Sequence, residues 1–514
     1  MVDQGVVCSV DPLVSGIGRQ VLSEGGNAVD AAIAAGAALT IVAPHLCGLG
    51  GDLFALVHRP GEAAPASLNA SGRAGSGADP EALRAEGRTT MPFRDDLRST
   101  PVPGCVDGWL ALHGRYGTKP MPELLAPAIG LAEDGWAATA MLATAGAALE
   151  GVEGAEDLVG LVAGDTVTRR RTAAALRAVA REGRDGFYLG EFGRGLIEKG
   201  EGLFTEADLA ASQADWEAPL SVDAFGHRMW TAAPNSQGYL LLLTLAVAER
   251  LDLPADPSDP LWAHYLVEAS RLAGYDRPER LHEGADVADL LAAAGERAAR
   301  VSAESRADVP VRQQAGGTTY MAVLDGEGMG VSYIQSNAAG FGTRLFEPRT
   351  GIGLQNRGIG FNLDPGHPAE FGPGRRPPHT LVPALVTRPD GSLRLIAGTM
   401  GGDSQPQIVA QLVSRVLVSG ESVREAVAAP RWRLHPGDVG FGTWSGDHEV
   451  DVELELDAPE SWSTGLVERG HLAARVAAGS SFGHAHLIEI DGEGHATGAA
   501  EPRVDSGTVG TVPN

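Results

Sequence analysis

Hydrophobic residues recur at regular intervals from the start of the chain, and these intervals predict its first elements. Residues Gly5–Val10 have the pattern of a strand, and Pro12–Ser23 that of an amphipathic helix. Asn27, with Asp30 three residues later, is a suitable N-cap for a second helix over Ala28–Ile41. This second helix is apolar on nearly all sides, so we expect it to be buried.

A glycine-rich turn follows the second helix. Gly48-Leu49-Gly50-Gly51 leads into a predicted strand, Leu53–His58. A phosphate-binding loop would need a helix after the glycines and a Lys-Ser/Thr pair, and the sequence has neither. We therefore interpret these glycines as positions where backbone segments approach one another closely.

The pattern changes between the two halves of the chain. Helical periodicity dominates from Pro122 to about Leu291, and short strands dominate after Thr318, which suggests stacked layers of helix and sheet. The acidic, glycine-punctuated stretch 437–460 predicts surface hairpins. The predicted helices are Leu124–Asp134, Ala137–Leu149, Arg169–Arg184, Glu206–Ala211, Leu240–Ala248 and Gln407–Val418, and the predicted strands are Thr318–Leu324, Gly330–Gln335, Leu381–Thr387 and Leu393–Gly398.

Composition narrows the possible partners. The chain has 514 residues, a formal net charge of −26 and a sequence pI near 4.9. Nucleic acids and anionic membrane surfaces both need a basic face, so we expect neither as a partner. No apolar run approaches the ~18 residues of a membrane span, and the opening residues lack a basic stretch followed by an apolar one. We therefore expect a cytoplasmic protein.

Three possible catalytic centres can be set aside on sequence grounds. His484 and His486 share a strand face, but no third ligand stands at a metal-site spacing, so we expect a structural role. The G-x-S-x-G match around Ser481 leads into a strand rather than a helix, unlike a serine hydrolase. The cysteines are scattered, as small buried thiols in a reducing compartment would be; they are Cys8, Cys47 and Cys105.

Thr318 is the remaining candidate nucleophile. If the chain is cut before it, its new α-amino group, with an ordinary pKa of ~7.7–8.0, can serve as the base for its own hydroxyl. The cut can be internal: Thr318 Oγ attacks the Gly317 carbonyl, and water hydrolyses the resulting ester. Gly316-Gly317 and the linker of about residues 306–317 provide a permissive residue and a segment that can move away. An ordinary strand beginning at Thr318 remains equally compatible with these residues alone.

Several blocks, in the same order, resemble the γ-glutamyltranspeptidase family. They are "EGGNAVDAAIAAGAALTIVAPHLCGLGGDLFALVH", "GGTTYMAVLDGEGMGVSYIQSNAAGFGT", "GTMGGDSQPQIVAQLV", "APRWRLHP" and "GAAEPRVDSG". The resemblance implies an α+β fold, the four-layer αββα sandwich of N-terminal nucleophile hydrolases. It also implies a precursor that is cut between Gly317 and Thr318 into a large subunit, 1–317, and a small subunit, 318–514, which stay together as a heterodimer within one compact unit.

The resemblance also assigns roles to individual residues. Thr318 matches the family's nucleophile, and Ser336 lies near the hydroxyl residue that supports it. Gly401 and Gly402 match the glycine pair whose N–H groups stabilise the tetrahedral oxyanion. Arg73 aligns with the arginine that grips the substrate α-carboxylate, a task suited to a planar guanidinium.

Other positions depart from the family pattern. Arg357 and Gly360 stand where the family has side chains that accept the substrate's α-ammonium, and an arginine would repel that group. His379 and Thr380 replace the serine pair that helps to bind the carboxylate, and Asn337 can replace a displaced asparagine. Arg357 could alternatively form a salt bridge with a neighbouring carboxylate, which would leave room for glutamyl specificity.

We therefore predict an autoprocessed amide hydrolase or acyltransferase for small acidic amides, which needs no metal and no organic cofactor. Arg73 and Arg357 together would suit a short acidic acyl group, such as a dicarboxylic acid monoamide, that lacks the ammonium. Similar relatives include glutaryl acylases and enzymes of specialised metabolism, some of which cleave a carbon–carbon bond. The sequence leaves that reaction open, as it does an unprocessed binding protein on the same fold.

Overall fold

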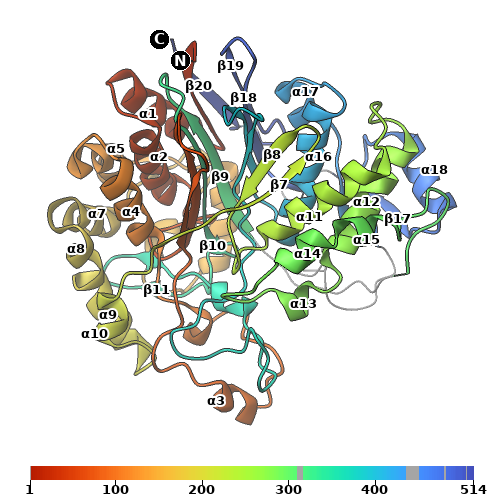
Figure 1. Cartoon of the computed structure of the whole chain (residues 1–514). Helices are drawn as coiled ribbons and strands as arrows, with labels where there is room; N and C mark the ends of the chain where they lie inside the picture. Colours follow the sequence, from red (N-terminus) through yellow and green to blue (C-terminus); the bar gives the residue numbers. More distant parts are fainter. Residues whose placement is uncertain are drawn as a thin grey trace.

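The computed structural model describes residues 2–308, 317–435, 451–477, 479, 482–504 and 506–513. Two stacked β-sheets form its centre, and helices cover the outer face of each sheet (Figure 1). The predicted linker lies mostly outside the described residues, as do Ser481 and most of the stretch predicted as surface hairpins.

The first sheet has seven antiparallel strands and combines both halves of the chain. Its order is β20-β1-β9-β10-β2-β3-β6. The strands are β1 (Gln4–Ser9), β2 (Asp52–His58), β3 (Ala66–Ala70), β6 (Asp215–Glu217), β9 (Gly317–Leu324), β10 (Gly330–Ala338) and β20 (Thr508–Pro513). Because β1 and β20 pair along their whole length, the two ends of the chain lie side by side (Figure 1).

The second sheet has six antiparallel strands in the order β19-β18-β14-β13-β8-β7. The strands are β7 (Leu220–Ala224), β8 (His227–Thr231), β13 (Ala384–Thr387), β14 (Leu393–Thr399), β18 (Ala485–Ile490) and β19 (Ala496–Ala500). Smaller sheets are formed by β4 (Trp136–Ala137) with β5 (Thr166–Val167), by β11 (Phe346–Glu347) with β12 (Ile352–Gly353), and by β15 (Trp432–Leu434), β16 (Val452–Glu455) and β17 (Ala473–Val476).

Helices of the first half cover the first sheet, and helices from both halves cover the second. The first layer contains α1 (Pro12–Ser23), α2 (Ala28–Val42), α4 (Cys105–Tyr116), α5 (Met121–Asp134) and α7 (Arg170–Glu182). The second contains α11 (Gly238–Ala248), α16 (Gln405–Leu417) and α17 (Val423–Ala428), and α12 (Pro260–Gly274) packs against α11 and α16. The other α-helices are α3 (Pro80–Ala85), α6 (Ala140–Gly146), α8 (Arg184–Tyr188), α9 (Glu191–Gly200), α10 (Glu206–Ala210), α13 (Arg277–Arg280), α14 (Ala288–Ala292), α15 (Ala294–Ala298) and α18 (Glu460–Glu468).

The two-residue period of β9 decides which way the candidate nucleophile faces. Met321 and Val323 pack against the helices of the first layer, whereas Tyr320 and Leu324 lie in the core between the two sheets. Successive side chains of a strand point to opposite faces. Thr318 therefore faces the second sheet.

Most of the predicted elements are confirmed. The first helix has the predicted bounds, and α2 has the predicted Asn27–Asp30 capping box and is buried along its whole length. Two predicted elements are shorter. The helix predicted from Ala137 begins at Ala140, because Trp136 and Ala137 pair with β5. The strand predicted from Leu381 begins at Ala384, directly after Pro383, which has no N–H to donate.

The prediction of a helix-rich half followed by a strand-rich half is wrong in one respect. Strands β6, β7 and β8 interrupt the stretch that we expected to be helical, and both large sheets contain strands from both halves. The described end of the stretch predicted as surface hairpins also differs: Val452–Glu455 is a fully buried strand of the three-stranded sheet.

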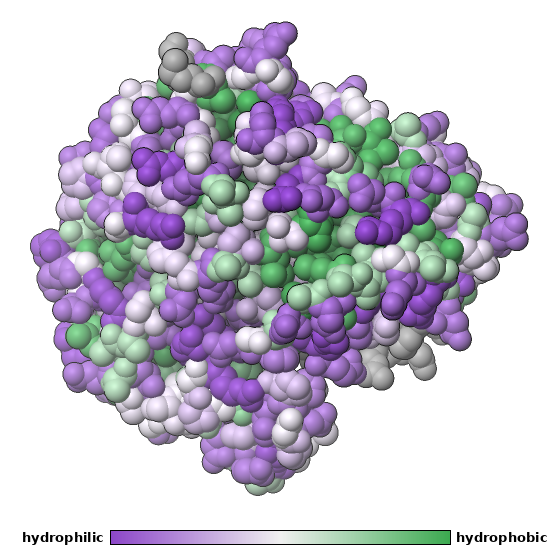
Figure 2. All heavy atoms as spheres, viewed as in Figure 1, coloured by the Kyte–Doolittle hydropathy of each residue, from purple (hydrophilic) through white to green (hydrophobic). Residues whose placement is uncertain are grey.

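The outer surface is mixed in character. Figure 2 shows a mostly hydrophilic face, on which hydrophobic side chains gather mainly over the layer that contains α11, α12 and α16. Among the described residues, no helix combines the length and the apolar composition that crossing a membrane requires.

Candidate active site

Thr318 occupies the second position of β9 and is 1% exposed. Its Oγ1 lies 3.2 Å from Ser336 Oγ on the neighbouring strand β10. The next residue, Thr319, points the other way and donates a hydrogen bond to the Gln335 carbonyl. The Thr318 hydroxyl thus lies in the core between the sheets, whereas the Thr319 hydroxyl bonds the backbone of the neighbouring strand.

Arg357 connects Ser336 to the next group of predicted site residues. It lies in a 3₁₀ turn, Arg357–Gly360, and is 1% exposed. Its Nη2 donates to Ser336 Oγ (3.1 Å), and its Nη1 donates to Thr380 Oγ1 (2.9 Å). Thr318, Ser336, Arg357 and Thr380, which are separated in sequence, therefore form one hydrogen-bonded group.

Asp52 is a buried member of this group that the sequence analysis did not select. Arg357 Nε donates to Asp52 Oδ2 at 3.0 Å, and His379 Nε2 lies 2.7 Å from the same oxygen. The alternative of a salt bridge at Arg357 is thus what the structure contains. An available signal was the position of Asp52, an acidic residue that opens an otherwise apolar strand. We call Thr318, Ser336, Arg357, Asp52 and His379 the nucleophile cluster.

The Gly401–Gly402 pair lies at the beginning of a helical segment. Both residues have positive φ angles, +136° and +58°, which favour glycine. They precede α16 through a 3₁₀ turn, at the end of a helix where backbone N–H groups have no intrahelical acceptor. Gln237 Nε2 donates to the carbonyls of both Gly402 and Thr380, at 3.0 Å each, and so joins the glycine pair to the residues around Arg357.

Asn337 is held by the chain segment just after α2. Its Nδ2 donates to the Pro44 carbonyl at 3.1 Å, and its buried Oδ1 has no hydrogen-bond partner among the described residues. A Cβ at Gly51 would lie 2.2 Å from the Ser336 carbonyl oxygen and 2.9 Å from Asn337 Oδ1. This close approach confirms the interpretation of the glycine-rich turn.

Arg73 belongs to a separate group of charges. Its guanidinium donates to Glu283 (2.5 Å), Asp215 (3.2 Å) and the Gly374 carbonyl (3.1 Å). Arg376 also contacts Asp215, at 3.0 Å. No contact among the described residues joins Arg73 to the nucleophile cluster. The structure therefore brings together the predicted hydroxyl residues Thr318, Ser336 and Thr380, but it does not bring Arg73 into their hydrogen-bonded group.

A small cavity of about 40 Å³ adjoins the nucleophile cluster. Its charged lining groups are Arg357, Arg277 and Asp403, and Arg277 Nη2 donates to Asp403 Oδ1 at 3.1 Å. The remaining lining residues are Ile359, Gly360, Pro378 and Thr380. Two cationic groups and one carboxylate thus surround a space with room for only a few non-hydrogen atoms.

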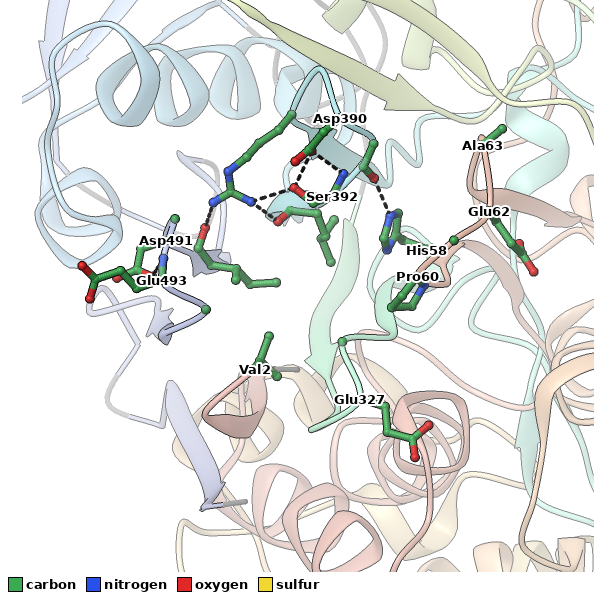
Figure 3. Close-up of a pocket in the computed structure, with 18 residues that line it drawn as sticks. Val2, His58, Pro60, Glu62, Ala63, Glu327, Asp390, Ser392, Asp491 and Glu493 are labelled. Carbon is green, nitrogen blue, oxygen red and sulfur yellow. Dashed lines mark hydrogen bonds between the residues drawn. The ribbon is translucent and has the colours of Figure 1, made fainter.

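A larger cavity, of about 700 Å³, opens at the other end of the sheets (Figure 3). It is lined by turns that include Pro60, Glu327 and Asp491, at the end of β9 and β10 that is remote from Thr318. Acidic side chains predominate around it; they are Glu62, Glu327, Asp390, Asp491 and Glu493. This lining would repel an anionic acyl group, so we place the candidate site at the small cavity.

The described residues at the beginning of the predicted linker are held by hydrogen bonds rather than loose. Ala307 N–H donates to Glu268 Oε2 at 2.5 Å, and Arg271 donates to the Ala307 carbonyl at 3.1 Å. His264 Nδ1 lies 3.0 Å from His471 Nε2, and this nitrogen of His471 lies 3.6 Å from Glu268 Oε1. We call Glu268, Arg271, His264 and His471 the anchor cluster. It corrects the prediction that the linker is loose from residue 306 onward.

Neither the thiols nor the histidines offer a competing centre. Burial raises the pKa of Cys8 to about 12 and that of Cys47 to about 11, so both remain protonated thiols at neutral pH. Among the residues that the structure describes, no three His, Cys, Asp or Glu side chains are arranged to hold a metal ion.

The sequence profile of the family described as Gamma-glutamyltranspeptidase matches residues 14–511. This chain belongs to the gamma-glutamyltranspeptidase family. Its relatives include the oxamate amidohydrolase proenzyme of Klebsiella pneumoniae, 35% identical, and the glutathione hydrolase-like YwrD proenzyme of Bacillus subtilis, 32% identical; each match covers 98% of both chains. The crystal structure of cephalosporin acylase from Bacillus halodurans is 32% identical, with a TM-score of 0.89 over 99% of this chain and 96% of that one.

These similarities confirm the predicted fold and the class of reaction. This gamma-glutamyltranspeptidase family member has the αββα fold of N-terminal nucleophile hydrolases. It is an amide-cleaving hydrolase or acyltransferase, and its relatives are made as proenzymes. The family match does not by itself assign roles to the residues of the nucleophile cluster.

Proposed function

We propose that this enzyme is cut between Gly317 and Thr318 and then hydrolyses amides of short acidic acyl groups, with Thr318 as its nucleophile. The observation that carries the proposal is the buried Thr318 hydroxyl, 3.2 Å from Ser336 Oγ, at the beginning of a central strand. This strand begins at the site where a proenzyme of this family would be cut. The same hydrogen-bonded group reaches the small cavity through Arg357 and Thr380.

The mechanism uses the new chain terminus as its base. The Thr318 α-amino group takes the hydroxyl proton as Oγ attacks the amide carbon, and the carbonyl electrons move to its oxygen. The N–H groups of Gly401 and Gly402 stabilise this oxyanion. The amine then leaves with the transferred proton, and water attacks the acyl-enzyme by the reverse sequence to release the acid.

Processing uses the same hydroxyl on the preceding peptide bond. Thr318 Oγ attacks the Gly317 carbonyl, the Thr318 nitrogen leaves as an amine, and water hydrolyses the ester. The two products remain together as a heterodimer because the sheet alternates between them: β9 of the small subunit pairs with β1 of the large one, and β10 pairs with β2. Residues 1–317 and 318–514 thus remain one compact unit.

The lining of the small cavity supports a short acyl group that carries a carboxylate and no ammonium. Arg277 and Arg357 both line the cavity, whereas the Asp52 carboxylate that balances the Arg357 charge is not part of the lining. Guanidinium groups can donate hydrogen bonds but cannot accept them, so a carboxylate is favoured there over an ammonium. A volume of about 40 Å³ suits an acyl group of two or three carbons better than a glutamyl group. Oxamate, named for the 35% identical relative, is an amide of this kind.

The decisive experiment measures processing and acylation together. A denaturing gel of the purified enzyme should show two chains, and mass spectrometry after incubation with oxamate should find the acyl group on the small chain at Thr318. Glutaryl-anilide and γ-glutamyl-anilide serve as a matched pair that differs only in the α-amino group. A single full-length chain in the active fraction would refute the mechanism, and a clear preference for the γ-glutamyl compound would refute the substrate class.

A further inference from the structure

The buried carboxylate of Asp52 lies behind the nucleophile cluster rather than in the cavity. It is 0% exposed, and its Oδ2 is hydrogen-bonded to both Arg357 and His379. Its second oxygen, Oδ1, has no hydrogen-bond partner among the described residues. A substrate in the small cavity would meet Arg357 and Thr380, not Asp52. Any effect of Asp52 on the reaction must therefore pass through its two neighbours.

His379 contributes a hydrogen bond to this arrangement and no charge. Its Nδ1 accepts from the Leu381 N–H at 3.2 Å, so the ring hydrogen lies on Nε2 and is donated to Asp52. Burial, and then the Arg357 charge, lower the pKa of His379 to about 4, which keeps the ring neutral at physiological pH. Burial alone would raise the pKa of Asp52, but His379 and Arg357 outweigh it and hold that pKa below its usual value.

The guanidinium of Arg357 is planar and rigid, and its bond to Asp52 fixes the orientation of that plane. Because the carboxylate binds Nε at 3.0 Å, Nη2 is directed to Ser336 and Nη1 to Thr380. A serine hydroxyl has one hydrogen to donate and two lone pairs that accept. Ser336 Oγ accepts from Arg357 and also from the Ala338 N–H at 2.8 Å. The same Oγ lies 3.2 Å from Thr318 Oγ1.

We propose that Asp52 and His379 are positioning residues that orient Arg357, and through it hold the Ser336 hydroxyl within hydrogen-bond distance of Thr318 Oγ. A Ser336 hydroxyl held at this position keeps the Thr318 hydroxyl in place for the transfer of its hydrogen to the α-amino base. Asp52 also balances the Arg357 charge in a buried site, where an unpaired charge would be costly. This inference rests on the proposed role of Thr318 as nucleophile.

The test is a double-mutant cycle on the processed enzyme. Asp52→Asn keeps the shape of the side chain and removes its charge, and we expect kcat to fall by roughly 10²-fold, the cost of a small misplacement of reacting groups. In a Ser336→Ala background the same change should have little further effect on kcat, because the hydroxyl that Asp52 orients is already gone. An equal loss in both backgrounds would overturn the proposal, as would a rise in KM with kcat unchanged.

Two further variants separate positioning from folding. His379→Gln removes a neutral hydrogen-bonding ring and no charge; we expect a smaller fall in kcat, again absent in the Ser336→Ala background. Glu268→Gln in the anchor cluster is the control for loss of a buried carboxylate and should leave kcat unchanged. If Asp52→Asn does not fold, the His379→Gln cycle decides alone: a loss of kcat that persists undiminished without the Ser336 hydroxyl refutes the inference.

The failure of this inference differs from the failure of the proposed function. If Thr318→Ala retains processing and activity, Thr318 is not the nucleophile, and both proposals are wrong. If Thr318→Ala is inactive while Asp52→Asn keeps the full kcat of the parent enzyme, the nucleophile stands and only the positioning role of Asp52 falls.

Discussion

Two buried clusters in this enzyme have nearly the same chemical parts and end on different groups. The nucleophile cluster contains a carboxylate, an arginine and a histidine, and so does the anchor cluster around Glu268 and Arg271. The first ends on the hydroxyls of Ser336 and Thr318. The second ends on the backbone of Ala307, at the beginning of the predicted linker. The same types of side chain thus contact hydroxyl groups in the nucleophile cluster and a backbone segment in the anchor cluster.

The two carboxylates also differ in how well they are compensated. Asp52 has a pKa below its usual value despite complete burial, because Arg357 and His379 both contact it. Burial raises the pKa of Glu268, and its contacts with Arg271 and Ala307 do not offset this. The well-compensated Asp52 carboxylate can hold the groups near Thr318 in a rigid geometry. The anchor cluster needs only to hold the backbone at Ala307 in place.

We expect the largest effect from replacing Thr318, which belongs to the nucleophile cluster and not to the anchor cluster. Thr318→Ala removes the proposed nucleophile, so it should leave a single full-length chain and lower activity by roughly 10⁴-fold or more. Gel electrophoresis and amide hydrolysis measure the two results on one preparation. The matched control Thr319→Ala should be cut normally, because that hydroxyl points away from Thr318 and bonds the Gln335 carbonyl and Cys47. Processing of Thr318→Ala at the wild-type rate would contradict the assignment.

The anchor cluster should show its effect in stability alone. Glu268→Gln leaves the Arg271 charge buried without its carboxylate, and breaking such a pair typically costs about 3–5 kcal/mol. We expect a lower midpoint of denaturation of the processed enzyme and an unchanged kcat. Chemical denaturation followed by tryptophan fluorescence measures the first quantity, and amide hydrolysis the second. A fall in kcat comparable to that of Asp52→Asn would show that the two clusters are not separate.

Much of the fold could be predicted, and Thr318 could be selected as a candidate nucleophile, because the signals for both are local. The apolar run over α2, the Gly-Gly-Thr-Thr sequence and the glycines at 401 and 402 each lie within a few residues. The order of the seven-stranded sheet has no such signal, because β9 and β10 insert between β1 and β2 of the other half. Strand pairing over that distance depends on the packing of the whole molecule.

The nucleophile cluster shows the same limit at the level of single residues. Asp52 is separated in sequence by 305 residues from Arg357 and by 327 from His379. The substituted residues at 357 and 379 were visible as departures from the family pattern, but their common partner was not. An acidic residue at the start of an apolar strand is a weak signal until the structure shows what it faces. His379 was expected at the substrate, and the structure directs its Nε2 to Asp52.

Arg357→Lys tests whether the fork geometry matters beyond the charge. Lysine keeps the positive charge next to Asp52 but cannot bond Asp52, Ser336 and Thr380 from one rigid plane. We expect kcat to fall by roughly 10²-fold with a smaller change in KM. Arg271→Lys in the anchor cluster is the matched control and should lower stability without lowering kcat. Equal losses of kcat in the two variants would mean that both act through general destabilisation.

Acid stability gives the smallest expected effect and compares the histidines of the two clusters. His379 has a pKa of about 4 when folded, below its ordinary 6.5, so the unfolded chain binds the extra proton between these values. Stability therefore falls as pH drops from 6.5 toward 4, and this one ring accounts for about 2 kcal/mol between pH 7 and pH 5. His379→Gln should lose that much less on acidification, measured as the shift of the denaturation midpoint. His471, whose pKa is lowered to about 2, should give a similar shift when replaced by Gln, but without a change in kcat. If His379→Gln keeps the full acid sensitivity of the parent enzyme, the ring is not held neutral beside Asp52, and the hydrogen bond assigned to it is wrong.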